Sequence, residues 1–267
     1  MERLLTPVAI AAVSLLAVAA AMAPARDRIE FAVRGKRLTV TIYRPAVPPK
    51  GTIVIGSGDV GWVGLAASLA EELSAGGYVV AGVNTREYLS SFTEGTQHLT
   101  VRDVPADFHE LIDLLRRTQL LHRPVVLSGV SEGAALAVLA ASDPKNHALV
   151  DGVITMGLPP TAELAWRWTD MGSWITKRDA NEPSFAPETV IAAVAPVPLV
   201  MIQSKKDEYV TETDYHRFLA TAKDPKKLVL IDASNHRFTD RRPELSAAYR
   251  DALAWIAMRG AEAGMRR

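Results

Sequence analysis

The chain has no cysteine among its 267 residues, so it can form neither a disulfide framework nor a thiolate metal site. It has no excess of charge, because 30 lysine and arginine residues balance 30 aspartate and glutamate residues, and it has no basic run. Both absences count against a nucleic-acid partner, which needs a positive surface. Histidine and acidic residues show no spacing typical of metal ligands. The sequence therefore predicts a protein that uses neither a metal nor a cofactor.

The N-terminal segment is strongly hydrophobic. Arg3 precedes an apolar stretch over residues 4–22, which ends in Ala23-Pro24-Ala25 and is followed by charged residues. A signal peptide over residues 1–25, cut after a small-x-small site, has this layout. An uncleaved membrane anchor is the alternative, since roughly 20 apolar residues span a bilayer. We expect the body of the protein in the periplasm or secreted, or anchored to the membrane if the leader is retained.

The rest of the chain alternates short apolar runs with amphipathic stretches. Residues 30–33 and 38–43 flank the turn Arg34-Gly35-Lys36 and predict a β-hairpin. Residues 84–100 are polar and irregular and predict a loop. Apolar runs predict buried strands, and 3.6-residue periodicity predicts helices. The strands are expected at 52–55, 78–83, 125–127, 149–156, 198–203 and 228–231, and the helices at 65–73, 104–120, 134–141, 212–222 and 243–258.

A hairpin followed by alternating strands and helices predicts an α/β fold, with a mostly parallel sheet and helices on both faces. We expect one domain over residues 26–267, since neither a repeat nor a change of composition divides it. The pattern is lost at residues 161–189, where charges and tryptophans mix. That segment predicts a short cap inserted into the domain.

The stretch after the strand at 125–127 carries the strongest functional signal. Gly129-Val130-Ser131-Glu132-Gly133 has the form G-x-S-x-G and stands between that strand and an alanine-rich helix. In this context the motif is a nucleophile elbow, with a serine at the apex of a strained turn. Small neighbours let the strand and the helix approach each other. We expect Ser131 to be a nucleophile; a chance match in a chain rich in small residues is the alternative.

A serine nucleophile needs a base, and the base needs an acid that orients it. In this fold the acid and then the histidine follow the serine along the chain, each just after a strand. Asp207 and His236 follow the strands at 198–203 and 228–231, so the sequence predicts a triad with Ser131. Glu208 and Asp232 are alternatives for the acid. A solvated surface role fits the remaining histidines, which are His98, His109, His122, His147 and His216.

Two backbone N–H groups should stabilise the oxyanion of the tetrahedral intermediate. We expect one from Glu132, which follows the nucleophile, and one from Asp59 in the loop after the strand at 52–55, with Val60 as second choice. The same loop, residues 56–61, matches the dinucleotide fingerprint G-x-G-x-x-G. That alternative needs an acid at the end of the next strand, and Val83-Asn84-Thr85 contains none.

Together, the elbow and the two strand-end motifs resemble the α/β-hydrolase superfamily over essentially everything after Ala25. A closer resemblance, to the bacterial VirJ/AcvB group of periplasmic hydrolases, is carried by Gly58-Asp59-Val60-Gly61-Trp62 and by residues 80–89. The chain departs from that group at Val60, where a glycine is usual, and at Glu132, where an aromatic residue is usual. The resemblance implies a serine hydrolase of envelope lipid, including release of the amino acid from aminoacyl-phosphatidylglycerol.

Tryptophans gather where this fold places its cap. We expect Trp62, Trp166, Trp168 and Trp174 to bind substrate, because tryptophan suits an acyl pocket or a lipid–water boundary. Packing of the cap onto the body is the alternative. The sequence thus predicts a serine esterase for a small-molecule or lipid ester, in contact with a membrane surface where the substrate is lipid. A non-catalytic envelope protein that binds a partner or a lipid on the same scaffold is the competing hypothesis.

Basic residues also stand on loops expected at the active-site end of the sheet. They fit either recognition of an anionic head group or a solvated basic rim. These residues are Arg86, Lys205, Lys206 and Arg237.

Overall fold

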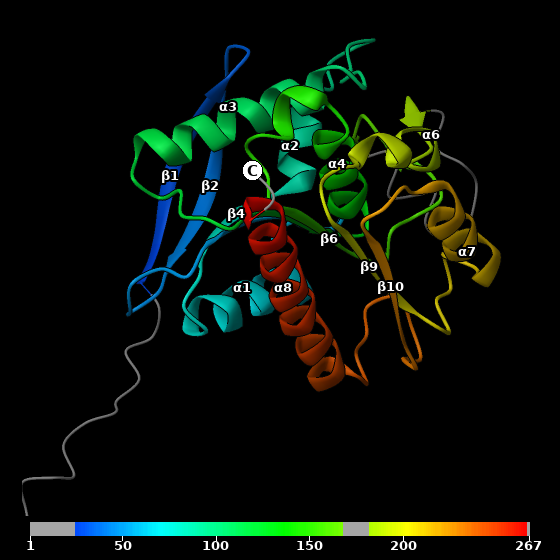
Figure 1. The fold of residues 1–267 in the computed structure, drawn as a ribbon. Helices are drawn as coiled ribbons and strands as arrows, with labels where there is room; N and C mark the ends of the chain where they lie inside the picture. The colour runs from blue at the N-terminus through cyan, green and yellow to red at the C-terminus, as the bar shows by residue number, and fades with distance from the viewer. Residues whose placement is uncertain (1–24, 168–181, 266–267) are drawn as a thin grey trace, which may run out of the picture.

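A computed structural model describes residues 25–167 and 182–265, in which one large sheet dominates (Figure 1). Eight strands of the described chain form it, in the order β1-β2-β4-β3-β5-β6-β9-β10. β1 pairs antiparallel with β2, and β2 pairs antiparallel with β4, whereas the other neighbours are parallel. Their bounds are Ala25–Val33 (β1), Lys36–Arg44 (β2), Thr52–Gly56 (β3), Val79–Val83 (β4), Val125–Val130 (β5), Gly152–Met156 (β6), Leu199–Ser204 (β9) and Lys226–Ile231 (β10).

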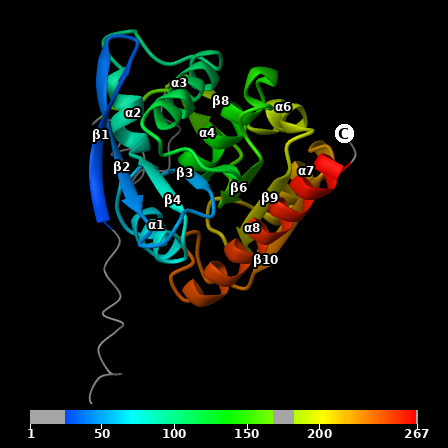
Figure 2. The same ribbon diagram turned by 60° about the vertical axis from the view of Figure 1, so that its left-hand side comes forward.

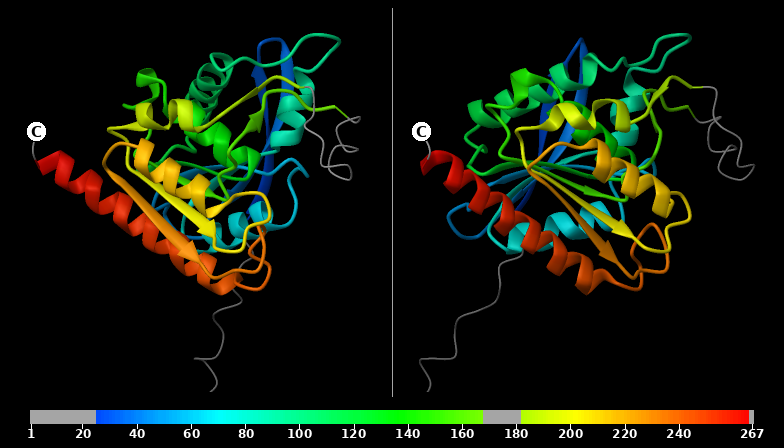
Figure 3. Two further views of the ribbon diagram at one scale, coloured as in Figure 1. Left: turned by 90° about the vertical axis from the view of Figure 1, so that its right-hand side faces the viewer. Right: turned by 45° about the vertical axis from the view of Figure 1, so that its right-hand side comes forward.

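Helices cover both faces of the sheet, so the predicted α/β class is confirmed (Figures 2 and 3). On one face lie α1 and α8; on the other lie α2, α3, α4, α6 and α7. The central strands β3, β4, β5, β6 and β9 are buried along their whole length, as parallel strands between two helical layers must be. The helices span Leu65–Ala75 (α1), Thr85–Ser91 (α2), Asp103–Arg117 (α3), Glu132–Ala141 (α4), Glu188–Ile191 (α6), Glu212–Thr221 (α7) and Arg242–Met265 (α8).

The loop predicted at residues 84–100 is wrong in its first half, which forms α2. Asn84 caps the helix, because its side-chain oxygen accepts the N–H of Glu87 at 3.3 Å. Tyr88 and Leu89 are buried in the main core cluster. The cap and the burial of these two side chains stabilise the helix although the segment is polar. Tertiary packing therefore determines the conformation of this segment.

The predicted leader and part of the predicted cap lie outside the described residues. Of residues 1–25 only Ala25 is described, as the first residue of β1. Of the cap at 161–189, the described ends form the short antiparallel pair β7 (Ala162–Glu163) and β8 (Ser184–Phe185), followed by α6. Among the helices of residues 25–167 and 182–265, none combines the length and the apolar character that a bilayer crossing requires.

Tyr88 ties α2 to α3, which makes it a test of the corrected element. Its hydroxyl donates to Asp107 Oδ2 at 2.7 Å, and Asp107 is buried. Tyr88→Phe should lower the free energy of unfolding by about 1–3 kcal/mol in chemical denaturation, because a buried acceptor loses its donor. Tyr209→Phe is the matched control: Tyr209 is 60% exposed, and its change should stay within about 0.5 kcal/mol. Equal effects would contradict this role of Tyr88.

Candidate active site

Ser131 stands at the turn between β5 and α4. Its backbone has a conformation that residues other than glycine rarely adopt. Its φ is 51° and its ψ is −118°. Such a conformation costs on the order of 1–3 kcal/mol and persists only where its surroundings hold it. One restraint is the N–H of Ser131, which donates to the carbonyl of Met156 at the end of β6, at 2.9 Å. The elbow is therefore tied to the neighbouring strand at the serine itself.

The residues around the serine must be glycines, because neighbouring backbone atoms lie too close to leave room for a side chain. A Cβ on Gly133 would lie 2.4 Å from the carbonyl carbon of Gly56, and one on Gly129 would lie 2.1 Å from that of Gly133. No side chain fits at either distance. The loop after β3 reaches the serine as well, since a Cβ on Gly58 would lie 3.7 Å from Cβ of Ser131. The early glycine loop and the elbow are thus direct neighbours.

His236 and Asp207 form a buried pair. Nδ1 of His236 lies 2.7 Å from Oδ2 of Asp207, whose side chain is fully buried. A carboxylate only accepts hydrogen bonds, so Nδ1 carries the hydrogen, and Nε2 is left as the acceptor of a neutral imidazole. Oδ1 of Asp207 accepts the N–H groups of Tyr209 and Val210 at 2.9 and 3.0 Å. Both carboxylate oxygens are therefore held, and they hold the ring in turn.

The geometry distinguishes among the acids that the sequence left open. Glu208 accepts the backbone N–H of His236 at 2.7 Å through Oε2, so it holds the histidine loop and does not face the ring. Asp232 is 59% exposed at its side chain and pairs with Lys206 at 3.3 Å. Asp207 alone of these three contacts the imidazole. The role of Glu208 as a second support was not predicted; a carboxylate next to the orienting acid was its only sequence signal.

Ser131 and His236 lie against consecutive residues at the end of β6. Met156 accepts the N–H of Ser131, and a Cβ on the next residue, Gly157, would lie 2.6 Å from Cε1 of His236. Within the described part of the chain, Nε2 of His236 is buried and has no hydrogen-bond partner. Ser131, Asp207 and His236 thus follow β5, β9 and β10 at their carboxyl ends; His236 contacts Asp207, whereas no hydrogen bond joins Ser131 Oγ to His236 Nε2 among the described residues.

The predicted oxyanion donors lie on the two segments that meet at the serine. The N–H groups of Asp59 and Glu132 donate to no backbone carbonyl of the described residues. Around Asp59 the loop turns tightly, because Gly61 N–H donates to the Gly58 carbonyl at 3.1 Å. Val60, the second choice, is the next residue and is 42% exposed.

Carboxyl groups gather beside these donors. Burial raises the pKa of Glu132 well above its usual value, and the charges of Asp59 and Glu163 raise it further. Oε2 of Glu132 is buried and receives no hydrogen bond from any described group. Burial also raises the pKa of Asp59, although the Val60 N–H and the charges of Arg237 and His236 partly offset this. The pKa of Glu132 therefore lies above that of an exposed glutamate.

Two of the four tryptophans are described. Trp62 donates from Nε1 to the hydroxyl of Tyr43 at 3.1 Å, and its ring covers Gly82, where a Cβ would lie 2.1 Å from Cζ2. Trp166 lies under the guanidinium of Arg86, 4.5 Å from its ring centre. Both line a groove beside the glycine loop. Trp168 and Trp174 lie outside the described residues.

No described group of histidine, aspartate and glutamate side chains is arranged to hold a metal ion in residues 25–167 and 182–265. The five remaining histidines do not reach the triad. His109 Nδ1 contacts Asn146 Oδ1 at 2.9 Å, and His147 Nε2 contacts the carbonyl of Ala141 at 3.1 Å. His98 and His216 are exposed, as a solvated surface role predicts, whereas His109, His122 and His147 are half-buried.

Known proteins are similar to this chain in sequence and in fold. The uncharacterized protein YfhR of Escherichia coli O157:H7 is 27% identical over 152 residues, which are 55% of this chain and 50% of YfhR. The chain thus spans about half the length of this relative. The esterase domain of a Rhodothermus marinus protein is 17% identical with a TM-score of 0.58, covering 86% of this chain and 97% of that one. The α/β hydrolase GrgF of Penicillium sp. sh18 is 14% identical with a TM-score of 0.64, covering 87% and 99%.

Such structural likenesses show an α/β-hydrolase fold. The family assignment comes from the sequence: the model of the family described as bacterial virulence protein (VirJ) matches residues 51–243. That match runs from β3 to the start of α8 and includes the glycine loop, the elbow, Asp207 and His236. Since it covers well over half of the chain, this protein belongs to the VirJ family and has a hydrolase scaffold.

Proposed function

We propose that this protein is an exported serine hydrolase that cleaves a carboxylic ester, acyl or aminoacyl, with Ser131, His236 and Asp207 as its triad. The 2.7 Å contact between His236 Nδ1 and the buried Asp207 carries the proposal, because it leaves Nε2 free at the edge where the strained serine stands. Fold alone does not establish chemistry, whereas an oriented base beside a strained serine has a specific catalytic use.

The proposed reaction proceeds through an acyl-enzyme. Oγ of Ser131 attacks the ester carbonyl carbon while Nε2 of His236 takes its proton. The carbonyl oxygen becomes an oxyanion, which accepts the N–H groups of Asp59 and Glu132; each such donor is worth about 3 kcal/mol. When the C–O bond breaks, the leaving alkoxide takes the proton from Nε2. Water then attacks the acyl carbon while His236 takes one of its protons. The bond from the acyl carbon to Oγ breaks, Oγ of Ser131 takes the proton back from Nε2, and the acid leaves.

The neutral form of Glu132 suits this reaction. A carboxylate beside an oxyanion would oppose the negative charge that develops there. Burial, together with Asp59 and Glu163, raises the pKa of Glu132 and keeps its proton on. The residue after the nucleophile then supplies its N–H without supplying a charge.

We propose an ester of envelope lipid as the substrate, such as aminoacyl-phosphatidylglycerol, and the periplasm as the location. The resemblance to the periplasmic VirJ/AcvB hydrolases supports both, and the leader-like N-terminus supports export. Val60 and Val63 next to the proposed oxyanion loop are 42% and 58% exposed, and they fit an apolar acyl chain or a lipid surface. A non-catalytic role in binding a partner or lipid is the rival that the first experiment below addresses.

Ser131→Ala should abolish hydrolysis of p-nitrophenyl butyrate and labelling by a fluorophosphonate probe, since both need the nucleophile. Thermal unfolding of the variant should match or exceed that of the wild type, because alanine retains the fold. Retained turnover would remove the proposed mechanism. Absent labelling of the wild type would favour the non-catalytic rival.

Asp207→Asn and Glu208→Gln separate the two carboxylates of the histidine loop. Asp207→Asn should lower kcat on the order of 10²–10⁴-fold, since an amide no longer fixes the tautomer of His236. Glu208→Gln retains an acceptor for the His236 N–H and should lower kcat less than about tenfold. Steady-state kinetics on the same ester decide the matter. A larger loss in Glu208→Gln would exchange the two assignments.

Glu132→Gln tests the neutral carboxyl through stability. Below about pH 4.5, the usual pKa of glutamate, folded and unfolded chains both hold the proton, so the variant should melt like the wild type. Above it the unfolded chain loses the proton that the folded chain keeps, which favours unfolding of the wild type only. Glutamine should therefore raise Tm by a few degrees at about pH 8 and by little at about pH 4. A variant less stable at about pH 8 would mean that Glu132 is charged in the fold.

A further inference from the structure

A groove of about 900 Å³ opens beside the proposed oxyanion loop, outside the triad itself. Thr39 and Thr41 of β2, residues of β1 and α2, and the tryptophans Trp62 and Trp166 line it. Its size falls within the range of small-molecule sites.

Arginines from separate segments line this groove. Arg26 and Arg28 are alternate residues of β1, so their side chains lie on the same face, and both are exposed. Neither makes an ion pair with an acid of the described chain; Arg26 instead lies 5.3 Å from the ring centre of Tyr43. Asp27 points to the opposite face, where it pairs with Arg44 at 2.7 Å.

Arg86 and Arg167 add two more guanidinium groups to the lining, and each has contacts of its own. Arg86 lies over the Trp166 ring at 4.5 Å, and Arg167 donates to the Gly95 carbonyl at 2.8 Å while pairing with Glu182. Among the described residues, Glu87 is the one acid that lines the groove. Its carboxylate accepts the N–H of Thr39 and the amide of Asn84, both at 3.4 Å. The described lining therefore carries four arginines and one carboxylate, and one of the arginines, Arg167, already pairs with Glu182.

The groove and the nucleophile share one loop. Val60, Gly61 and Trp62 line the groove, and Gly58 touches Ser131 from the same turn. An ester bound at Ser131 can therefore extend its leaving alcohol past Val60 toward the arginines. An anionic group a few atoms beyond the ester oxygen would then enter the groove.

We propose that this arginine groove binds a phosphate group, as a monoester or diester, on the alcohol side of the substrate. The planar guanidinium fork pairs with two phosphate oxygens at once, which a single ammonium does not. Arginines from β1 and α2 that line one groove can contact the same phosphate. The assignment to the substrate rests on the proposed esterase function, whereas phosphate binding by the groove stands independently of it.

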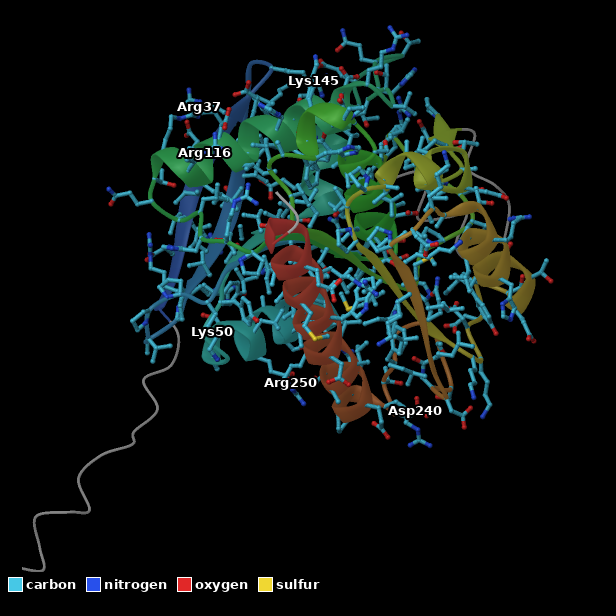
Figure 4. The ribbon with its side chains drawn as sticks, viewed as in Figure 1. Arg37, Lys50, Arg116, Lys145, Asp240 and Arg250 are labelled. Carbon is cyan, nitrogen blue, oxygen red and sulfur yellow. The ribbon has the colours of Figure 1, made fainter. Side chains whose placement is uncertain are left out.

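The test uses the purified chain, as the cell exports it, carrying Ser131→Ala so that nothing is consumed. Binding is measured to vesicles of phosphatidylcholine mixed equally with phosphatidylglycerol, to phosphatidylcholine vesicles alone, and to sn-glycerol 3-phosphate by calorimetry. Arg26→Gln/Arg28→Gln is compared with Arg116→Gln/Arg117→Gln, which removes the same charge from the C-terminal end of α3, where Figure 4 labels Arg116. Arg28→Gln alone gives a milder variant should the pair reduce folding.

Arg26→Gln/Arg28→Gln should weaken binding to the anionic probes roughly tenfold or more, and Arg28→Gln by an intermediate factor. The α3 pair should change binding less than about twofold, because it shifts only the overall charge. Loss on glycerol 3-phosphate as well as on vesicles assigns the site to phosphate itself; loss on vesicles alone assigns it to a lipid head group. Equal effects of the two pairs, or no effect, overturn the proposal.

Hydrolysis by the wild type is measured as well, so that failure of the groove proposal can be distinguished from failure of the proposed esterase function. Turnover of p-nitrophenyl butyrate without any effect of the β1 arginines on binding would reject the groove and leave the esterase standing. A clear arginine effect on binding, with no labelling of Ser131 by a fluorophosphonate, would reject the esterase and leave the groove standing.

Discussion

The close approach of α4 to the ends of β3 and β5 is the constraint on which the site depends. Gly56, Gly129 and Gly133 meet with their backbones in contact, and no Cβ fits at these positions. The contact is also hydrogen-bonded, since the N–H of Gly133 donates to the carbonyl of Ser57 at 3.1 Å. Ser57 in turn accepts the N–H of Thr85 through Oγ at 3.1 Å, which joins the elbow to the start of α2. The strained serine, the oxyanion loop and one wall of the groove are therefore positioned by a single backbone junction, and a side chain there would displace all three.

Much of the fold could be predicted, because buried parallel strands appear as apolar runs and their carboxyl ends fall at definite points in the chain. That placement is why Asp207 and His236 could be named from sequence. The choice between Asp207 and Glu208 could not be made in the same way. Adjacent residues in a turn point in different directions, and only the folded loop shows that one carboxylate faces the ring and the other the backbone. The helix at Thr85–Ser91 was missed for a related reason: its stability comes from Tyr88 and Leu89 entering the core, and its own composition gives little sign of it.

The arginine groove illustrates what composition conceals. Equal numbers of acidic and basic residues exclude a large overall field, yet Arg26, Arg86 and Arg167 come from distant segments and line one groove. In the sequence alone, each of these arginines is typical of a solvated surface residue. Only the pairing of β1 with β2, the position of α2 and the turn before Trp166 bring them together. Trp62 is a comparable case. It was predicted to bind substrate from its place in the glycine loop, and it packs on Gly82 while it also lines the groove.

The loop from Ser57 to Val63 separates two kinds of charge. The carboxyl group of Asp59 in this loop interacts with that of Glu132, which follows the serine, whereas Val60 to Val63 line the groove together with the arginines of β1 and α2. In the proposed reaction, an ester with an amine on its acyl part and a phosphate on its alcohol part would bind in one orientation only. The amine would lie near the carboxyl groups and the phosphate near the arginines. The amine would lower the pKa of Glu132 again by pairing with it, so the pocket would stay close to neutral with or without the amine. A purely neutral acyl group would gain nothing from that carboxyl, and it would lose little, because Glu132 then keeps its proton. The same residue can therefore favour an aminoacyl group without opposing the oxyanion that forms beside it.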